Sequence, residues 1–580
     1  MRPSTSKTHL VGKDAPLEVT LEKMQSQLSR LGFEVEPKSW LNPVPHVWSV
    51  HLQDKHCPQL FTNGKGTSKE AALASALGEF FERLSSNYFW ADYWLGPEIA
   101  ESDFVHYPNE VWLPATPHSI QSVLLDETSR AIYADFLHPD ALVDINSGAP
   151  HRGICALPFV RQSDQQPVLF PVNLIGNLFV SNGMAAGNTQ AEAQVQALSE
   201  ICERAVKNHL LSEGLCPPQI PDAVLARYPK VMAAIQALQA AGFHLQVRDA
   251  SLGGIYPVIN VNLLNPKDGG CFASFGAHPL FEVALERTVT ELLQGRALDQ
   301  LDVFAPPSFD LDAVADPHNL ETHFIDSSGL VGWPLVADQA DYPFTEWDFQ
   351  GDTEAQRQQL LNQLETQGHS VYIAEYNHLG VAACRILVPG FSEIYPPQDL
   401  HWDNNNQGVA LRDALLNLAE LDRPQLADLL DQLNEQGFND QQPVAALIGV
   451  VPGAGFWKSL RIGALKAMLC LALGEVEEAL ALVENHLLFG HLAETEQRHY
   501  RCLRALLEIH IADQPWQDFQ SALHAYFGET EVQICTALIE GKRTFHGLTP
   551  APGLTGLQAH QALLDAYHKV QAAKAAALSP

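Results

Sequence analysis

Two segments of this chain repeat one helical pattern, and that duplication constrains the fold more than any other feature. The first segment runs from Gly66 to Arg83, and the second runs from Gly187 to Arg204. Each has an Asn-Gly pair upstream, a glycine thirteen residues before its first glutamate, and the ending Ala-Leu-x-Glu-x-x-Glu-Arg. We therefore interpret them as two copies of one helix that pack around a shared centre.

Both copies begin with residues that favour a helix start. Thr67 with Glu70, and Thr189 with Glu192, have the Thr-x-x-Glu spacing of a capping box. We expect each threonine to cap the first turn of its helix.

A third segment is a looser copy of the same helix. It opens at His278-Pro279, where we expect the histidine to be a capping or packing residue. It ends with Glu291, which aligns with Glu79 and Glu200 of the other two copies. Four residues before this glutamate, the three copies contain Ser75, Gln196 and Arg287. Because Arg287 replaces a polar residue of the other copies, it has the strongest claim among the arginines to a functional role.

The glutamates of the first two copies project from one face of each helix. Glu79 and Glu82 are three residues apart, as are Glu200 and Glu203. Glu192 lies eleven residues before Glu203, about three turns, and shares its face. Because the neighbouring positions are apolar, the glutamates interrupt an apolar surface and do not form a clean solvent-facing stripe.

Converging carboxylates limit what such a site can hold. In a partly buried site they repel one another and stay ionised only if cations are present. Mg²⁺ with nucleotide phosphates meets that need, because Mg²⁺ prefers a few carboxylates plus phosphate oxygens. Arginine supplies bidentate contacts to the phosphates themselves. The three helices therefore predict a site for magnesium and a nucleotide.

A purely structural interpretation of the glutamates remains open. A single Glu-x-x-Glu-Arg on a helix is most often a solvated, salt-bridged face. The duplication makes that interpretation less favoured here. Under it, Arg83 and Arg204 pair with the acids of their own helices.

The first part of the chain mixes helices and strands. An amphipathic helix over residues 16–31 is expected to end at Gly32. Asn63-Gly64 is typical of a turn, and Gly64-Lys65-Gly66 has only weak appeal as a phosphate-binding loop. Apolar, β-branched runs predict strands at residues 47–52, 168–170, 258–264, 371–374 and 381–388. The fold class is therefore α+β up to about residue 400.

After about residue 405, leucine and alanine dominate and the strand signals vanish. Helices are predicted over residues 460–474, 476–488 and 500–511. They fit either a tetratricopeptide-like array or an irregular helical cap. We assign residues 1–60 to the N-terminal part of a core, 61–400 to the core with the three glutamate helices, and 405–580 to an all-helical domain.

Charge and cysteine content argue against several classes of protein. Acidic residues outnumber basic ones by 68 to 35, a net charge of −33, so direct binding of nucleic acid is not expected. The nine cysteines form no Cys-x-x-Cys pair, which argues against zinc and disulfides. Without an apolar signal core or a membrane-spanning run, we expect a cytoplasmic protein. Walker, Rossmann and kinase motifs are also absent, so a nucleotide site must use another architecture.

Three segments resemble the signature regions of the YcaO family. They are NGKGTSKEAALASALGEFFERLSSNYF, NGMAAGNTQAEAQVQALSEICERAVKN and CFASFGAHPLFEVALERTVTELLQGR, and the opening GKDAPLE is similar as well. The likeness runs through most of the chain. It implies a YcaO-type nucleotide-binding core of helices and antiparallel sheets, followed by an all-α, tetratricopeptide-like C-terminal domain.

The resemblance also implies an ATP-dependent, amide-activating enzyme. YcaO enzymes bind ATP without a Walker loop, through Mg²⁺ held by helix glutamates, and they phosphorylate a backbone amide oxygen of a peptide. The Mg²⁺ ligands that it implies are Glu79, Glu82, Glu192, Glu200, Glu203 and Glu291. The nucleotide contacts that it implies are Lys13, Ser75, Asn188, Arg204 and Arg287. No catalytic residue is assigned, and which glutamate binds which ion stays open.

The implied partners are a ribosomal protein and a methylthiotransferase. The subfamily with this helical C-terminal part is named for an accessory role in β-methylthiolation of a ribosomal protein. Azoline-forming members end in a proline-rich tail, whereas this sequence ends in Ala-Ala-Leu-Ser-Pro, which weighs against cyclodehydration of Cys, Ser or Thr. A non-catalytic nucleotide-binding adaptor and a metal-dependent hydrolase remain the alternatives. The oligomeric state is open, with a homodimer among the options.

Overall fold

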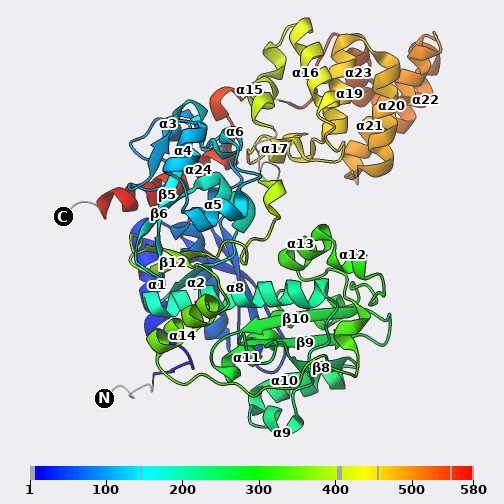
Figure 1. Ribbon diagram of the computed structural model, residues 1–580. Helices are drawn as coiled ribbons and strands as arrows, with labels where there is room; N and C mark the ends of the chain where they lie inside the picture. The colour runs from blue at the N-terminus through cyan, green and yellow to red at the C-terminus, as the bar shows by residue number, and fades with distance from the viewer. Residues whose placement is uncertain are drawn as a thin grey trace, which may run out of the picture.

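The computed structural model describes residues 7–145, 147–400, 408–453, 456–490, 492–548 and 551–577. Figure 1 shows a larger body of helices and strands, and a bundle of helices set apart at the upper right. The expected α+β class with a helical C-terminal domain is confirmed. The boundary predicted at residue 405 lies outside the described residues.

Three antiparallel sheets build the larger body. Their strands are β1 (Val35–Val44), β2 (Val47–Asp54), β3 (Phe61–Gly66), β4 (Val111–Leu113), β5 (Ile154–Arg161), β6 (Pro167–Pro171), β7 (Met184–Gly187), β8 (His244–Asp249), β9 (Val258–Leu264), β10 (Cys271–Ala277), β11 (Tyr372–Tyr376) and β12 (Ala382–Leu387). The sheet orders are β1-β2-β3, β10-β9-β8, and β4-β5-β11-β12-β7 with β6 paired to β5. All five predicted strands are confirmed, as β2, β6, β9, β11 and β12.

Helices cover these sheets (Figure 1). Those of the larger body are α1 (Leu17–Leu31), α2 (Lys69–Ser85), α3 (Gly96–Ala100), α4 (Pro117–Ser122), α5 (Glu127–Tyr133), α6 (Pro139–Leu142), α7 (Val172–Leu174), α8 (Gln190–Ser212), α9 (Asp222–Leu225), α10 (Pro229–Ala240), α11 (Phe281–Leu292), α12 (Leu311–Ala315), α13 (Pro317–Ile325) and α14 (Thr353–Thr366). The prediction that α1 ends at Gly32 is confirmed, since this glycine adopts the left-handed conformation with φ of 81°.

Each glutamate helix packs on the strand that precedes it. The pairs are β3 with α2, β7 with α8, and β10 with α11. A strand glycine permits the close approach, because a Cβ atom on Gly66, Gly187 or Gly276 would lie 2.7, 2.9 or 2.6 Å from a helix backbone nitrogen. The repeated unit is therefore a strand followed by a helix, and not a helix alone.

The Asn63-Gly64 pair is not a turn, so that prediction was wrong. It lies inside β3, where Asn63 is opposite His51 and Gly64 is opposite Val50 of β2. A Cβ atom on Gly64 would lie 2.1 Å from the carbonyl oxygen of Ala72 in α2. A glycine needed for close packing has the same sequence signature as a glycine needed for a turn.

The helix starts also differ from capping boxes. Ser68 caps α2 in place of Thr67, accepting a backbone hydrogen bond at 3.1 Å. Thr189 caps α8 as predicted, accepting from the backbone nitrogen of Glu192 at 3.1 Å. The carboxylate of Glu192 does not return to its own helix start, because it accepts a hydrogen bond from the backbone of Asp14 at 2.9 Å.

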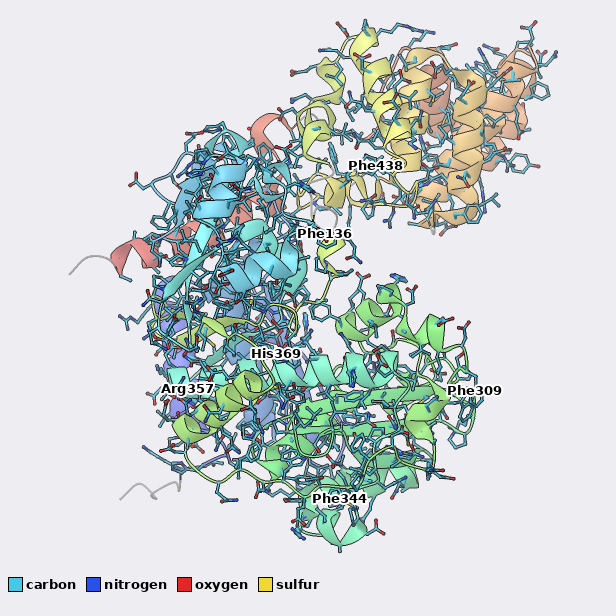
Figure 2. The ribbon with its side chains drawn as sticks, viewed as in Figure 1. Phe136, Phe309, Phe344, Arg357, His369 and Phe438 are labelled. Atoms are coloured by element: carbon cyan, nitrogen blue, oxygen red, sulfur yellow. The ribbon has the colours of Figure 1, made fainter. Side chains whose placement is uncertain are left out.

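The helical domain follows the larger body in the chain. Its helices, and the final helix of the chain, are α15 (Arg412–Leu416), α16 (Arg423–Glu435), α17 (Val444–Leu447), α18 (Phe456–Ser459), α19 (Ile462–Leu473), α20 (Val476–Phe489), α21 (Glu494–Ile511), α22 (Gln520–Phe527), α23 (Glu529–Ile539) and α24 (Gln558–Ala576). The three predicted helices are confirmed as α19, α20 and α21. Consecutive helices pack on one another, and Phe438 belongs to their apolar core (Figure 2).

The last helix, α24, leaves the helical domain and packs on the larger body (Figure 1). The hydroxyl group of Tyr567 donates to the carbonyl oxygen of Val105. The indole of Trp90 donates to the carbonyl oxygen of Leu563 at 2.9 Å. The end of the described chain therefore joins the N-terminal layer. Among the helices of the described ranges, none combines the length and the apolar character needed to cross a bilayer.

Candidate functional site

Lys65 lies among glutamates that come from three helices. It forms an ion pair with Glu291 of α11. Burial lowers the pKa of Lys65 to about 8, and the negative charges of Glu203, Glu79 and Glu200 oppose that shift. The structure thus brings these carboxylates from α2, α8 and α11 into one site.

Glu82 of α2 belongs to the same site. Burial raises the pKa of Glu82 well above its usual range, and the neighbouring carboxylates of Glu200 and Glu79 raise it further. The guanidinium groups of Arg83 and Arg204 act in the opposite direction. Because burial prevails, the protonated form of Glu82 is favoured unless further positive charge approaches it.

Five basic side chains accompany these five carboxyl groups. Arg83 donates to Glu79 at 2.7 and 2.9 Å, Arg204 pairs with Glu200, and Arg287 lies 3.8 Å from Glu203. Lys65 and Lys207 complete the set, and burial lowers the pKa of Lys207 to about 8 as well. The chain's own cations therefore offset much of the negative charge of the cluster, although Glu82 keeps a raised pKa. The sequence patterns did not place the two lysines, so this internal contribution was not expected.

Arg287 of α11 keeps unused hydrogen-bonding capacity. One of its terminal nitrogens donates to Gln196 of α8, but its Nε is buried and has no hydrogen-bond partner among the described residues. By contrast, Arg204 is engaged by its own surroundings, since it pairs with Glu200 and lies 4.3 Å from the ring centroid of Phe324. The structural interpretation therefore describes Arg204 better than it describes Arg287.

Three other predicted residues form a second group at the start of α8. Lys13 lies 3.3 Å from Glu192, and Asn188 donates to the same carboxylate at 2.9 Å. Thr20 donates to Asn188 at 2.9 Å and fixes its orientation. Burial opposes ionisation of Glu192, but Lys13 and the backbone of Asp14 outweigh it and lower the pKa of this carboxyl group.

The two groups lie along one face of α8. Glu192 precedes Glu200 by eight residues, which is about 12 Å along the helix axis. The structure therefore does not bring Glu192 into the cluster around Lys65. Gln196 lies between them, and Ser75 is exposed on α2 one turn before Glu79. The predicted residues thus outline an elongated site.

His278 connects the two groups. Its Nδ1 accepts a hydrogen bond from the backbone of Leu280 at 3.0 Å, and a Cβ atom on Gly12 would lie 3.0 Å from its ring. Burial, then the charges of Arg287 and Lys13, lower its pKa well below the usual range. As expected, it is a capping and packing residue, and it stays neutral between two cations.

Sequence reasoning missed Lys65 and Lys207. Lys207 follows Glu203 by four residues and so shares its helix face, a spacing that could have revealed it. Its ammonium group also donates to the carbonyl oxygen of His323 at 2.7 Å. Lys65 stands between two glycines and gave no comparable signal, because the turn prediction removed it from consideration.

A cavity of about 880 Å³ adjoins the cluster. Its lining includes Tyr88 and Phe324, the rings on which two arginines of the cluster stack. One wall includes part of a π-helix (Ile175–Phe179) and Val180, whose φ of 50° is rare for a β-branched residue. Gly449 of the helical domain lines the cavity too. Such backbone features concentrate at functional sites.

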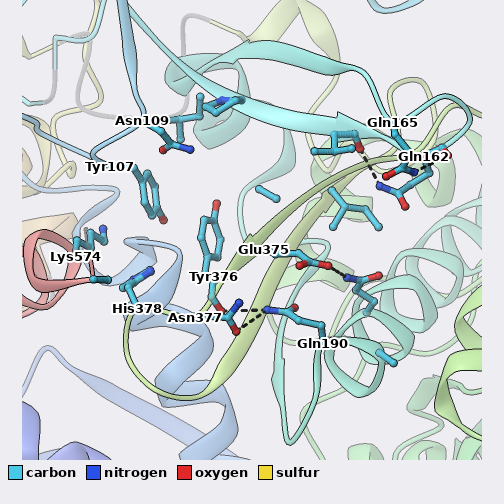
Figure 3. A pocket seen from close by; sticks show the side chains of 18 of the residues that line it. Tyr107, Asn109, Gln162, Gln165, Gln190, Glu375, Tyr376, Asn377, His378 and Lys574 are labelled. Atoms are coloured by element: carbon cyan, nitrogen blue, oxygen red, sulfur yellow. Dashed lines mark hydrogen bonds between the residues drawn. The ribbon is translucent and has the colours of Figure 1, made fainter. Parts of the chain in front are cut away.

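A second cavity, of about 900 Å³, shares Tyr107 and Leu157 with the first (Figure 3). Tyr107 stacks on Tyr376 of β11, with ring centroids 5.0 Å apart. The pairing of β5 with β11 stops at Ile373, although β11 continues to Tyr376. Amide side chains such as Gln190 line the space beyond (Figure 3). The two cavities therefore lie on either side of one aromatic residue.

Comparison with protein-family models shows which family the chain belongs to. Residues 63–392 match the family model described as "YcaO cyclodehydratase, ATP-ad Mg2+-binding", and residues 408–576 match the "YcaO cyclodehydratase C-terminal domain". The chain belongs to the YcaO family. ATP and Mg²⁺ are therefore the cofactors of this YcaO domain, as the sequence resemblance implied.

Two curated relatives match nearly the whole YcaO chain. The "Ribosomal protein S12 methylthiotransferase accessory factor YcaO" of Escherichia coli (strain K12) is 52% identical over an alignment of 582 residues that covers 98% of this chain and 99% of that protein. An "Uncharacterized protein" of Haemophilus influenzae is 50% identical over an alignment of 585 residues that covers 98% of this chain and 99% of the relative.

Solved structures are more distantly similar. A "Heterocyclase in complex with substrate and Cofactor" is 19% identical with a TM-score of 0.46, covering 67% of this chain and 55% of that chain. YcaO from Methanopyrus kandleri bound with AMPPCP and Mg²⁺ is 19% identical with a TM-score of 0.39, covering 66% of this chain and 93% of that chain.

The residues of the site fit both cofactors. Glutamate oxygens are the hard donors that Mg²⁺ prefers, and the cluster around Lys65 supplies them from three helices. A phosphate group needs donors, and the buried Nε of Arg287 is one without a partner among the described residues. Carboxylates that can bind a metal ion and basic side chains that can bind a polyphosphate therefore lie side by side.

Proposed function

We propose that this chain uses ATP to activate a backbone amide of a protein substrate by phosphorylation. The observation that carries the proposal is the meeting of five carboxyl groups with five basic side chains beside a large cavity. The Nε of Arg287 lacks a partner among the described residues, so this guanidinium group keeps a donor for a phosphate oxygen.

The residues divide by their place along α8. The proposed Mg²⁺ ligands are Glu79, Glu82, Glu200, Glu203 and Glu291. The proposed nucleotide contacts are Lys13, Ser75, Asn188, Arg204 and Arg287, with Glu192 holding Lys13 and Asn188 in place. Bound Mg²⁺ neutralises charge on phosphate oxygens as it does in other phosphoryl-transfer enzymes. We add Lys65 to the phosphate contacts, because its partner Glu291 becomes a metal ligand.

The cavity beside the cluster is the proposed place of the substrate amide. Its wall of aromatic rings and irregular backbone comes from both the larger body and the helical domain. A substrate bound there would displace water from the side of the cluster, which limits direct hydrolysis of the nucleotide. The chain's own contribution is to hold the amide oxygen in line with the transferred phosphoryl group.

The proposed substrate is ribosomal protein S12, acted on together with its methylthiotransferase. The relative from Escherichia coli carries that accessory role in its name and matches 98% of this chain. The net charge of −33 favours a basic partner, and proteins that bind RNA are basic.

Transfer of ¹⁸O tests this proposal. S12 labelled with ¹⁸O in its backbone is incubated with the full chain, Mg²⁺, ATP and the methylthiotransferase, and the released phosphate is analysed by mass spectrometry. Amide activation joins the amide oxygen to the γ-phosphorus and releases ADP. A nucleophile then attacks the amide carbon and breaks the carbon–oxygen bond, so ¹⁸O is expected in the released phosphate. S12 should also speed phosphate release at least ~10-fold.

The outcome separates the alternatives. Phosphate release without ¹⁸O contradicts amide activation and indicates simple hydrolysis. Tight ATP binding with no turnover in the presence of S12 also contradicts it, and favours the non-catalytic adaptor. Metal binding without nucleotide binding favours the metal-dependent hydrolase.

A further inference from the structure

The helical domain contains a second group of metal-ligating side chains. His499 on α21 lies 2.6 Å through its Nδ1 from a carboxylate oxygen of Glu531 on α23. The Sγ atom of Cys535, also on α23, lies 3.8 Å from the same Nδ1 and 3.9 Å from the same oxygen. Cys502, one turn after His499, contacts the thiol of Cys535. Three side chains that suit a transition metal therefore meet between two helices, with a second thiol, that of Cys502, beside them.

The spacing explains why the sequence did not reveal this group. His499 and Cys502 are three residues apart, and Glu531 and Cys535 are four apart, so each pair lies on one helix face. The absence of a Cys-x-x-Cys pair argued against zinc, but that motif describes ligands on loops and tight turns. Two neighbouring helices can present the same ligand set with helical spacing.

The distances are close to those of a tetrahedral zinc site. Zinc lies about 2.0–2.3 Å from nitrogen, oxygen and sulfur ligands, so neighbouring ligand atoms are roughly 3.3–3.8 Å apart. Both distances to the Cys535 sulfur are already near this range. The His499–Glu531 pair, at 2.6 Å, has to open by less than about 1 Å, and the Cys502 thiol has to turn from Cys535 towards the other ligands.

Burial makes the group a closed site and not a solvated one. His499 is 3% exposed, and Cys502 and Cys535 are fully buried. The ring of His546 stacks on His499 with centroids 5.1 Å apart and covers one side. Thiol and imidazole ligands select zinc over Mg²⁺ or Ca²⁺, and four protein ligands without an open position are typical of structural zinc.

We propose that His499, Cys502, Glu531 and Cys535 bind one structural zinc ion that fastens α21 to α23. This site is separate from the glutamate cluster and independent of the proposed function. Zinc binding deprotonates the thiols and would hold α21 and α23 together. The ion would set the stability of the helical domain and leave the nucleotide chemistry of the larger body unchanged.

Metal content and cobalt spectroscopy on the full chain test the proposal. After purification in metal-free buffer, we expect about one zinc per chain by mass spectrometry. Replacement by Co²⁺ should give the near-ultraviolet absorption of a cobalt–thiolate bond. Cys535→Ser should lower the zinc content at least ten-fold and abolish this band, whereas Mg²⁺-dependent ATP binding stays unchanged.

Two controls make the result specific. Cys470→Ser changes another buried cysteine of the helical domain, and Cys155→Ser changes one that lies near His106 and Asp144 in the larger body. Both variants should keep the zinc and the cobalt band. Glu531→Gln preserves side-chain volume and should weaken zinc at least ten-fold if Cys535→Ser does not fold.

Three results would overturn the proposal. The first is a wild-type chain that binds no zinc and shows no cobalt–thiolate band. The second is a Cys535→Ser or Glu531→Gln variant with an unchanged zinc content. The third is a loss of zinc in the Cys155→Ser variant alone. A bound Co²⁺ ion without the thiolate band would also contradict it, because that spectrum indicates carboxylate ligands.

Discussion

Lys65 of β3 and Glu291 of α11 form an ion pair in the centre of the glutamate cluster. With the neighbouring arginines, this pair lets the chain neutralise its own carboxylates. Buried carboxylates without partners would destabilise the fold strongly. Under the proposed function, metal binding at this site is therefore an exchange of partners, in which Glu291 leaves Lys65 for the ion.

Glu203→Gln should weaken Mg²⁺-dependent ATP binding. The amide keeps the hydrogen bond that Glu203 accepts from the backbone of Ala277, at 3.2 Å, so the fold is retained while one charged donor is lost. Calorimetric titration of ATP with Mg²⁺ should show at least ~10-fold weaker binding, or about 1.4 kcal/mol.

Glu286→Gln is the matched control for that experiment. Glu286 is on α11, where it faces Glu282 and Lys230 and not the cluster. The Glu286→Gln variant should bind Mg²⁺ and ATP like the wild type. Equal binding by both variants would remove Glu203 from the site.

Arg287→Lys should lower kcat/KM for ATP by at least ~10-fold. Lysine keeps the positive charge but lacks the planar guanidinium group. The variant therefore loses the hydrogen bond to Gln196 and the Nε donor that has no partner among the described residues. Steady-state phosphate release measures the effect. Arg227→Lys, which changes an exposed pair with Glu346, should have no effect, and an Arg287→Lys enzyme with wild-type kinetics would contradict the assignment.

Glu82→Gln should stabilise the chain when Mg²⁺ and ATP are absent. Burial raises the pKa of Glu82 well above its unfolded value, so the wild type loses stability as the pH rises above about 4.5. Glutamine does not titrate and avoids this loss. At pH 7 we expect a gain of about 1–3 kcal/mol in the free energy of unfolding, shrinking towards pH 5.

Denaturant unfolding at both pH values checks this prediction. A variant that is less stable than the wild type at pH 7 would show that the Glu82 carboxylate is satisfied as an ion within the chain. Loss of Mg²⁺ binding in the same variant would mark a site where function is favoured over stability.

His560 of α24 should make the fold sensitive to mild acid. Its Nε2 donates to the carbonyl oxygen of Trp94 at 2.8 Å, and its Nδ1 accepts from the backbone of Val451 at 3.0 Å. Burial lowers its pKa from 6.5 to about 4, so the folded chain binds fewer protons than the unfolded chain between these values. The contribution of the neutral His560 side chain to the free energy of unfolding is therefore fully present above pH 6.5 and is lost as the pH falls towards 4.

A comparison with His560→Gln isolates this contribution. Between pH 7 and pH 4.5 the wild type should lose about 2–3 kcal/mol more of its free energy of unfolding than the variant. Parallel pH profiles for the two proteins would show that His560 does not hold the helical domain to the larger body.

Local patterns in the sequence were enough to predict much of the fold. The repeated glutamate motif placed α2 and α8, and apolar runs placed β9 and β12, because both signals are periodic within a few residues. The role of Gly64 was misread because its neighbour, Ala72, follows a bend in the chain. Similarly, the return of α24 to Trp90 depends on a contact between distant parts of the chain, which no local pattern encodes.

Local patterns predicted the candidate site only in part, as they did the fold. The convergence of Glu79, Glu200 and Glu291 was expected from the internal repeat. The position of Glu192 was not, because helix periodicity gives the face of a side chain but not how far along the axis its partners lie. Lys65 was not predicted as a site residue, because a single lysine in a glycine-rich strand has no distinguishing pattern.

Anomalous scattering from crystals of the full chain with Mn²⁺ and a non-hydrolysable ATP analogue tests the central claim most directly. We predict manganese peaks bound by carboxylates of the cluster, about 2.0–2.3 Å away, with Glu291 released from Lys65. Manganese bound elsewhere, with Glu291 still paired to Lys65 and Glu79 to Arg83, would contradict the account.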